Sequence, residues 1–192
     1  MFKALIAMLG LTFAVHAQAA PSILDQLITV QTNAVMEAHT LGLDWKVGDT
    51  ASYDLNIGGF IKGSMVMSVA SIGDDGIWMN QDADLGFAGK QKIQALIDPN
   101  TGAIKKLIAN GQEQQVPKQD LEIIDTKEEK ITVPAGTFDS IHVTAHDKAS
   151  SDKGNIEVWL NPQQVPVGGT LKQQAPTQFG TMTMSLKSFK KN

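Results

Sequence analysis

Hydrophobic and polar residues alternate along most of the chain after Asp44. Segments such as ASYDLNI (51–57) and GSMVMSVA (63–70) place apolar side chains at every second position, which is the period of a β-strand with one buried face. Turn residues such as Asn110-Gly111 separate successive segments. The connections between successive segments are too short for the crossovers that parallel strands require. The pattern therefore predicts a strongly curved antiparallel sheet of about ten strands.

A different period marks residues 21–41. Apolar side chains recur there every three or four positions, as on one face of a helix, with Ser22 placed to cap its start and Gly42 to end it. The polar face lacks the lysines and arginines of a membrane-surface helix, so we expect this helix to pack on the protein's own sheet. The predicted fold class is α+β, mainly β: an incomplete barrel with the N-terminal helix on its concave side.

The first 19 residues have the organisation of a secretory signal peptide. Lys3 precedes an apolar run from Ala4 to Val15, and small residues follow at Ala17 and Ala19. The run is shorter than the roughly 20 residues that span a bilayer as a helix. We therefore expect cleavage after Ala19, no permanent membrane anchor, and a soluble periplasmic protein in which residues 20–192 form a single half-barrel domain.

The composition excludes several kinds of chemistry. Lys and Arg number 16 against 20 Asp and Glu, for a formal net charge of −4, and the lysines are scattered, so no nucleic acid partner is expected. The chain has no cysteine. Disulfides, thiol catalysis, zinc–thiolate sites and a lipid-modified cysteine are therefore excluded.

The polar residues form no recognisable catalytic or metal-binding motif. His142 and His146 are four apart on a predicted strand, which separates them by about 13 Å, whereas two ligands of one metal each lie about 2 Å from it. We expect both histidines on an exposed face. The acidic segment 74–84 lacks the spacing of a calcium loop, and the serines lack a G-x-S-x-G motif. The sequence predicts no enzyme, no metal site and no cofactor.

Three motifs carry a resemblance to known proteins. WKVGDTASYDL (45–55), VPAGTFDSIHV (133–143) and EVWLNPQQVPVGGTLK (157–172) resemble a set of uncharacterised exported bacterial proteins, whose fold is similar to that of the outer-membrane lipoprotein carriers. The resemblance covers most of residues 43–190 and consists of turn and strand signatures. In VPAG, proline and glycine occupy the positions that suit a type I turn, so this tetrapeptide is a fold marker. In the carriers a concave apolar surface holds acyl chains, and the resemblance implies a similar half-barrel here.

Soft apolar side chains are the remaining signal for a binding site. Methionine is unbranched and adaptable, which suits a pocket for a flexible apolar ligand and an irregular core equally. Two hypotheses stay open: a soluble carrier for an apolar or lipid-like small molecule, and a structural or docking module for another cell-envelope protein. If a ligand binds inside the half-barrel, the sequence predicts contacts with Met65, Met67, Trp78, Phe87, Trp159, Met182 and Met184.

Overall fold

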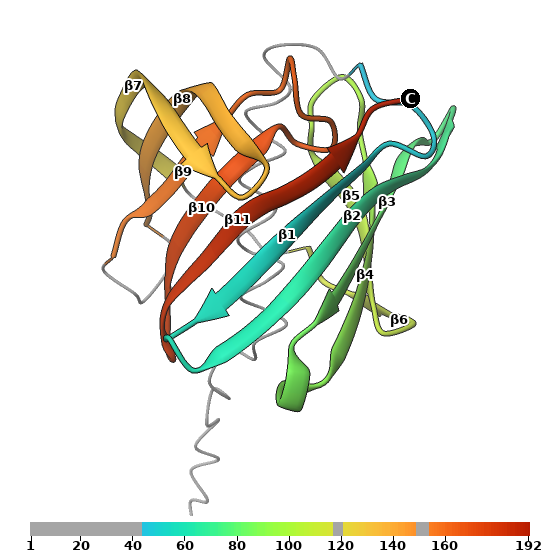
Figure 1. The fold of residues 1–192 in the computed structure, drawn as a ribbon. Helices are drawn as coiled ribbons and strands as arrows, with labels where there is room; N and C mark the ends of the chain where they lie inside the picture. Colours follow the sequence, from blue (N-terminus) through green and yellow to red (C-terminus); the bar gives the residue numbers. More distant parts are fainter. Residues whose placement is uncertain (1–43, 117–120, 149–153) are drawn as a thin grey trace, which may run out of the picture.

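The computed structural model describes residues 44–116, 121–148 and 154–192, which form one antiparallel sheet of eleven strands (Figure 1). The strands are β1 (Thr50–Ile57), β2 (Ile61–Gly73), β3 (Gly76–Asp84), β4 (Lys90–Ile97), β5 (Ile104–Ala109), β6 (Gln112–Gln114), β7 (Leu121–Val133), β8 (Gly136–Asp147), β9 (Ile156–Leu160), β10 (Thr170–Thr177) and β11 (Gly180–Lys190).

The first and last strands meet in the middle of the sheet. The strand order is β6-β5-β4-β3-β2-β1-β11-β10-β9-β8-β7. Pairs therefore form between strands that follow one another along the chain, apart from the pair of β1 with β11. The two edges are β6 and β7, which follow one another along the chain. From β1 and β11 the sheet curls toward both edges, as Figure 1 shows. The result is an incomplete barrel whose two edge strands, within the described residues, each pair on one side only.

Alternation along each strand gives the sheet two different faces. In β1, Ala51, Tyr53, Leu55 and Ile57 are buried, whereas Asp54 and the other intervening residues are more accessible. Successive side chains of a strand point to opposite sides, so the buried set lies on one side of the sheet. We call this side the inner face and the opposite side the outer face. The inner face holds most of the hydrophobic core.

The α+β fold class predicted from the sequence is wrong for the part of the chain that the structure describes. That part is all-β and contains no α-helix; its one helical element is a 3-10 turn, η2, at Gly86–Ala88. It accordingly holds no helix that is long and apolar enough to cross a membrane. The predicted helix at 21–41 and the predicted leader at 1–19 lie outside the described residues.

The sheet has eleven strands where the pattern predicted about ten. The additional strand is β6, whose three residues, Gln112–Gln114, are all polar and exposed. It pairs with β5 across the turn at Asn110-Gly111. The alternation of apolar residues could not reveal β6, because neither of its faces is buried.

The VPAG segment is a tight hairpin turn between β7 and β8. Val133 pairs with Gly136, whose φ of 140° is a conformation that favours glycine. The backbone N–H of Ala135 donates a hydrogen bond to the carbonyl oxygen of Leu186 at 3.1 Å. This bond fixes the tip of the hairpin against β11. The motif therefore has a structural role, as the sequence predicted.

The connection between β9 and β10 belongs to the core. Val165 and Val167 are fully buried in it, and Val167 has a φ of 57°, which is rare for a β-branched residue. A Cβ at Gly169 would lie 2.5 Å from Pro162 Cα. The loop is therefore packed closely on itself, and its conformation is held by the surrounding structure.

Candidate functional site

Four methionines come together on the inner face around β1. Met65 and Met67 lie on β2, and Met182 and Met184 lie on β11, and each of the four is at most 2% exposed. Strand β1 pairs with both β2 and β11, so residues about 120 positions apart in sequence become neighbours across a single strand. The structure thus assembles this part of the predicted contact set. Their soft side chains cover the centre of the apolar face.

The three aromatic residues of the predicted set lie elsewhere. Trp159 pairs with His142 and Lys172 on the outer face. Trp78 is half-buried on the outer face of β3, opposite the side on which its neighbours are buried. Phe87 lies in the η2 turn and is 82% exposed. The structure therefore does not bring these three side chains to the methionines.

Tyr53 places a polar group among the methionines. Its side chain is fully buried on β1, with Met65 and Leu186 as its cross-strand partners, and its hydroxyl has no hydrogen-bond partner among the described residues. Burial raises the pKa of the Tyr53 hydroxyl well above its usual range, so the group stays neutral and can donate a hydrogen bond. The sequence analysis missed this residue. The available signal was that the chain's single tyrosine occupies an inward-facing position of a strand.

Gln81 is a second polar residue on the inner face. It lies on β3, is 2% exposed and pairs with Met67 of β2. Its side-chain Nε2 donates a hydrogen bond to the Sδ atom of Met65 at 2.9 Å. A thioether sulfur is a weak acceptor. Tyr53 and Gln81 thus place two donors near the inner-face methionines, and the acceptor of Gln81 is a weak one.

A polar and aromatic cluster occupies the outer face of β7 to β10. We call Glu129, His142, Glu157, Trp159 and Lys172 the outer-face cluster. The His142 and Trp159 rings stack at 4.0 Å between centroids, and Lys172 Nζ lies 4.8 Å from the centroid of the Trp159 ring. The indole Nε1 donates a 2.6 Å hydrogen bond to Glu129 Oε1. These contacts join four adjacent strands near the β7 edge.

The expectation that His142 is solvent-exposed is wrong, because this outer-face cluster buries it to 7% exposure. Its Nδ1 lies 2.9 Å from Glu129 Oε1 and its Nε2 lies 3.5 Å from Glu157 Oε2, although neither nitrogen makes a well-directed hydrogen bond. His146 is half-buried and pairs with Glu122 on β7. No group of three or more acidic or histidine side chains within the described ranges is arranged to hold a metal ion.

The hydrogen bond from Trp159 is the main cause of a shifted pKa in Glu129. Together with Lys127, whose Nζ lies 3.2 Å from Glu129 Oε2, it lowers the pKa of the Glu129 carboxyl below its usual value. Both contacts stabilise the ionised carboxylate. Glu129 therefore carries a negative charge, and its hydrogen bond with Trp159 links β7 with β9.

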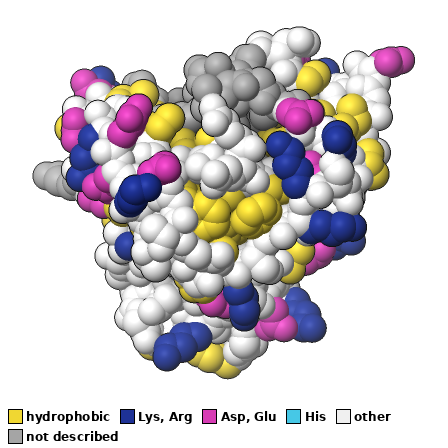
Figure 2. All heavy atoms as spheres, turned by 45° about the horizontal axis from the view of Figure 1, so that its top comes forward, with side chains coloured by type: hydrophobic (Ala, Val, Ile, Leu, Met, Phe, Trp, Pro, Cys, Tyr) yellow, Lys and Arg dark blue, Asp and Glu magenta, His cyan; other side chains and the backbone are white. Residues whose placement is uncertain are grey.

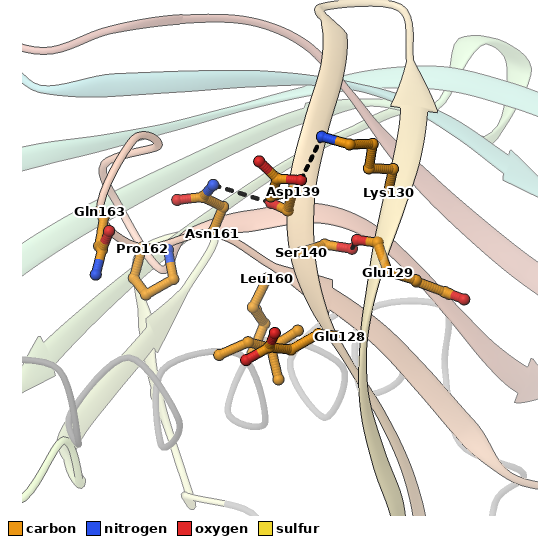
Figure 3. A pocket seen from close by; sticks show the side chains of 10 residues that line it. Glu128, Glu129, Lys130, Asp139, Ser140, Leu160, Asn161, Pro162 and Gln163 are labelled. Atoms are coloured by element: carbon orange, nitrogen blue, oxygen red, sulfur yellow. Dashed lines mark hydrogen bonds and ion pairs between the residues drawn. The ribbon is translucent and has the colours of Figure 1, made fainter.

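A crevice of about 440 Å³ opens beside this cluster, between the β7–β8 hairpin and the residues that follow β9 (Figure 3). Asp139 pairs with Lys130 at 2.5 Å, and its carbonyl oxygen accepts a 2.9 Å hydrogen bond from Asn161 Nδ2. Three of the residues that line the crevice are acidic and one, Lys130, is basic. The lining residues are Glu128, Glu129, Lys130, Asp139, Ser140, Ile141, Leu160, Asn161, Pro162 and Gln163.

No family model and no curated protein matches this sequence. Among solved structures, the hypothetical protein CT021 from Chlamydia trachomatis is 13% identical, with a TM-score of 0.53 over 82% of this chain and 92% of that one. A Bacteroides fragilis protein with a YmcC-like fold, provisionally described as exported, is 10% identical, with a TM-score of 0.41 over 78% of this chain and 99% of that one.

MucB also matches, at 11% identity and a TM-score of 0.45 over 87% of this chain. This chain covers 59% of the length of MucB. Another matching structure is a complex of MucA and MucB from Pseudomonas aeruginosa. The matching structures also include proteins described as exported or as lipoproteins, which is the group that the sequence motifs resemble.

Proposed function

We propose that this protein is a non-catalytic carrier that is exported to the periplasm after cleavage at Ala19, and that it binds an apolar or lipid-like molecule on its inner face. The observation that carries the proposal is the group of four methionines around β1, which the fold assembles from two distant segments. Flexible, polarizable side chains can adjust to a flexible chain, whereas a rigid core needs no such adaptability. Tyr53 and Gln81 add polar atoms that could orient the ligand, as in small-molecule sites generally.

The open sheet gives such a ligand a route to the inner face. Within the described ranges, β6 pairs only with β5 and β7 pairs only with β8. The two edges can therefore separate without breaking a ladder of backbone hydrogen bonds, which a closed barrel could not do. Widening of the half-barrel would give a ligand access to the methionines.

Solvent extraction tests the carrier function directly. Protein purified from a bacterial periplasm is extracted with chloroform and methanol, and the extract is analysed by mass spectrometry. We expect an apolar molecule in near-stoichiometric amount, and a rise in melting temperature when the stripped protein is reloaded with that molecule. An empty extract, with no binding of the fluorescent apolar probe N-phenyl-1-naphthylamine, contradicts the proposal.

A matched pair of variants locates the binding face. Met67 and Val66 are consecutive on β2 and lie on opposite faces, with Met67 buried on the inner face and Val66 40% exposed. Met67→Leu should change probe affinity, because leucine is stiffer at nearly the same volume. Val66→Leu should leave the affinity unchanged. Equal effects of the two variants would show that the probe binds elsewhere.

A second candidate function is docking of another envelope protein at the β7 edge. Strand β7 is 13 residues long, pairs on one side only among the described strands, and exposes Ile123 and Ile124 at 59% and 55%. An extended segment can add to such an edge by backbone hydrogen bonding. The charged residues from Lys127 to Lys130 disfavour the pairing of another chain with the middle of β7. Docking would therefore use the first residues of this strand. The acidic crevice next to the hairpin suits a basic side chain of the partner.

Site-specific crosslinking tests this second candidate. A photoreactive amino acid at Ile124 should capture a defined envelope protein in living bacteria. The control carries the same group at Phe87, which is more exposed but lies away from both edge strands. Capture at both positions, or at neither, counts against docking at the β7 edge.

A further inference from the structure

Tyr53 presents a polar group that the fold itself does not use. The side chain lies on β1, between β2 and β11, and its hydroxyl oxygen is buried without a hydrogen-bond partner in residues 44–116, 121–148 and 154–192. Burying a hydroxyl without a partner costs free energy, and buried side-chain polar atoms in native proteins usually have partners. Phenylalanine would fill the same place without this cost. Packing of the sheet therefore does not account for the hydroxyl.

The surroundings of Tyr53 determine what the hydroxyl could bind. Its cross-strand partners are Met65 and Leu186, and its neighbours on the inner face of β1 are Ala51 and Leu55. No one of these side chains is charged. The hydroxyl remains protonated in this environment, because burial raises its pKa, and so it acts as a donor.

An acceptor without charge fits this site better than an anion. A carboxylate brought to the inner face beside Tyr53 would lose its hydration and find no cation among these neighbours. A carbonyl oxygen of an ester or an amide needs only a donor. Gln81 Nε2 is a further donor on the same face, and its present acceptor is the thioether of Met65.

We propose that Tyr53 donates a hydrogen bond to the carbonyl oxygen of a neutral acyl ester or amide, whose hydrocarbon chain lies along the inner-face methionines. This inference rests on the proposed carrier function and specifies its ligand class. Apolar contacts with the hydrocarbon chain provide the affinity for the ligand, and the hydrogen bond from Tyr53 positions its carbonyl group. A site that hydrogen-bonds one group discriminates against analogues that lack it.

Displacement of N-phenyl-1-naphthylamine from the full chain tests the inference. The competitors are methyl dodecanoate, dodecanoate and dodecane, which present an ester, a carboxylate and no acceptor on similar chains. For the wild-type protein we expect methyl dodecanoate to bind most tightly. In Tyr53→Phe its affinity should fall about fivefold to tenfold, while dodecane affinity is unchanged. The melting temperature of Tyr53→Phe should equal or exceed that of the wild type, since the unpaired hydroxyl is gone.

The control variant is Met184→Leu, which alters the same face without changing any donor. It should shift the affinities of ester and hydrocarbon together. If Tyr53→Phe weakens the binding of methyl dodecanoate and of dodecane equally, or weakens neither, Tyr53 does not bind a carbonyl and the inference is wrong. If the wild-type protein binds neither the fluorescent probe nor any competitor, the carrier function itself fails. If dodecanoate binds most tightly, the site takes an anion and the neutral ligand class is wrong.

Discussion

The centre of the sheet and its β7 edge are both built from β-strands, but they differ in how deeply their side chains are buried. On β1, β2 and β11 the inward side chains are buried and apolar. On β7 most of the side chains on both faces are accessible, including Ile123 and Ile124. A strand in the middle of the sheet pairs on both sides, whereas β7 pairs only with β8 in the part of the chain that the structure describes. Burial here is set by position in the sheet at least as much as by sequence pattern.

The same comparison holds for polar groups. At the centre, Tyr53 is buried among apolar side chains and its hydroxyl is unpaired. Near the edge, Glu129 accepts a hydrogen bond from Trp159 and forms an ion pair with Lys127. Polar contacts therefore stabilise the periphery, and apolar packing stabilises the centre. In Figure 2 lysine and acidic side chains are interspersed around an area of hydrophobic side chains.

Replacement of a buried methionine should give the largest effect. Met67→Ala removes a nearly fully buried side chain from the centre of the inner face, and we expect a loss of about 2–5 kcal/mol in the free energy of unfolding. Val66→Ala, at the next residue but on the outer face, should cost less than about 1 kcal/mol. Urea unfolding measures both. Equal losses would mean that the two faces are not distinguished by burial.

A smaller but still large effect is expected at Gly169. Alanine there would have to adopt a φ of +69° and would bring its Cβ within 2.5 Å of Pro162 Cα, so we expect a loss of about 2–4 kcal/mol. Gly111, in the turn beside the β6 edge, has a φ of +84° but nothing within 4 Å of an added Cβ. Gly111→Ala should therefore cost only about 1–2 kcal/mol. A smaller loss at Gly169 than at Gly111 would show that the loop before β10 can relax.

The pH dependence of stability tests the polar cluster near the edge. The folded protein lowers the pKa of Glu129, so the resulting stability is present above the ordinary glutamate pKa of about 4.3 and is lost as the pH falls through the lower, folded value. Glu129→Gln should be less stable than the wild type at pH 6, and the difference should shrink below pH 4. Urea midpoints between pH 3 and 6 measure it.

The control for this experiment is Glu128→Gln, which removes a charge from the opposite face of the same strand. Trp159→Phe removes the principal donor to Glu129 and should reduce the same pH-dependent difference. A stability difference for Glu129→Gln that is constant with pH would show that the carboxylate contacts are not formed in solution.

The smallest effect is expected at the exposed residues of β7. Ile123→Ser and Ile124→Ser should each change the free energy of unfolding by no more than about 0.5 kcal/mol, because neither side chain is packed. Ile57→Ser, at a buried position of β1, provides the contrast and should be severely destabilising. A large loss at Ile123 or Ile124 would indicate that this edge is covered in solution.

Much of the sheet could be predicted from local pattern. The alternating segments 51–57 and 63–70 lie within β1 and β2, and the Asn110-Gly111 and VPAG turns lie where they were expected. The short strand β6 and the all-β class of the described residues were not predicted, since β6 has no buried face and propensity alone does not fix fold class. The buried His142 was also missed, because strand alternation places it on the outer face but does not show that Trp159 covers it.

The sequence by itself determined where the strands run and which side chains share a face, because these depend on the period of the residues along each strand. Only the tertiary structure decided that β1 lies between β2 and β11, which places Tyr53 between Met65 of β2 and Leu186 of β11. The tertiary structure also separated Trp78, Phe87 and Trp159 from those methionines. Pairing between distant strands depends on the closure of the whole sheet, and a local pattern carries no information about which strand becomes the neighbour of which.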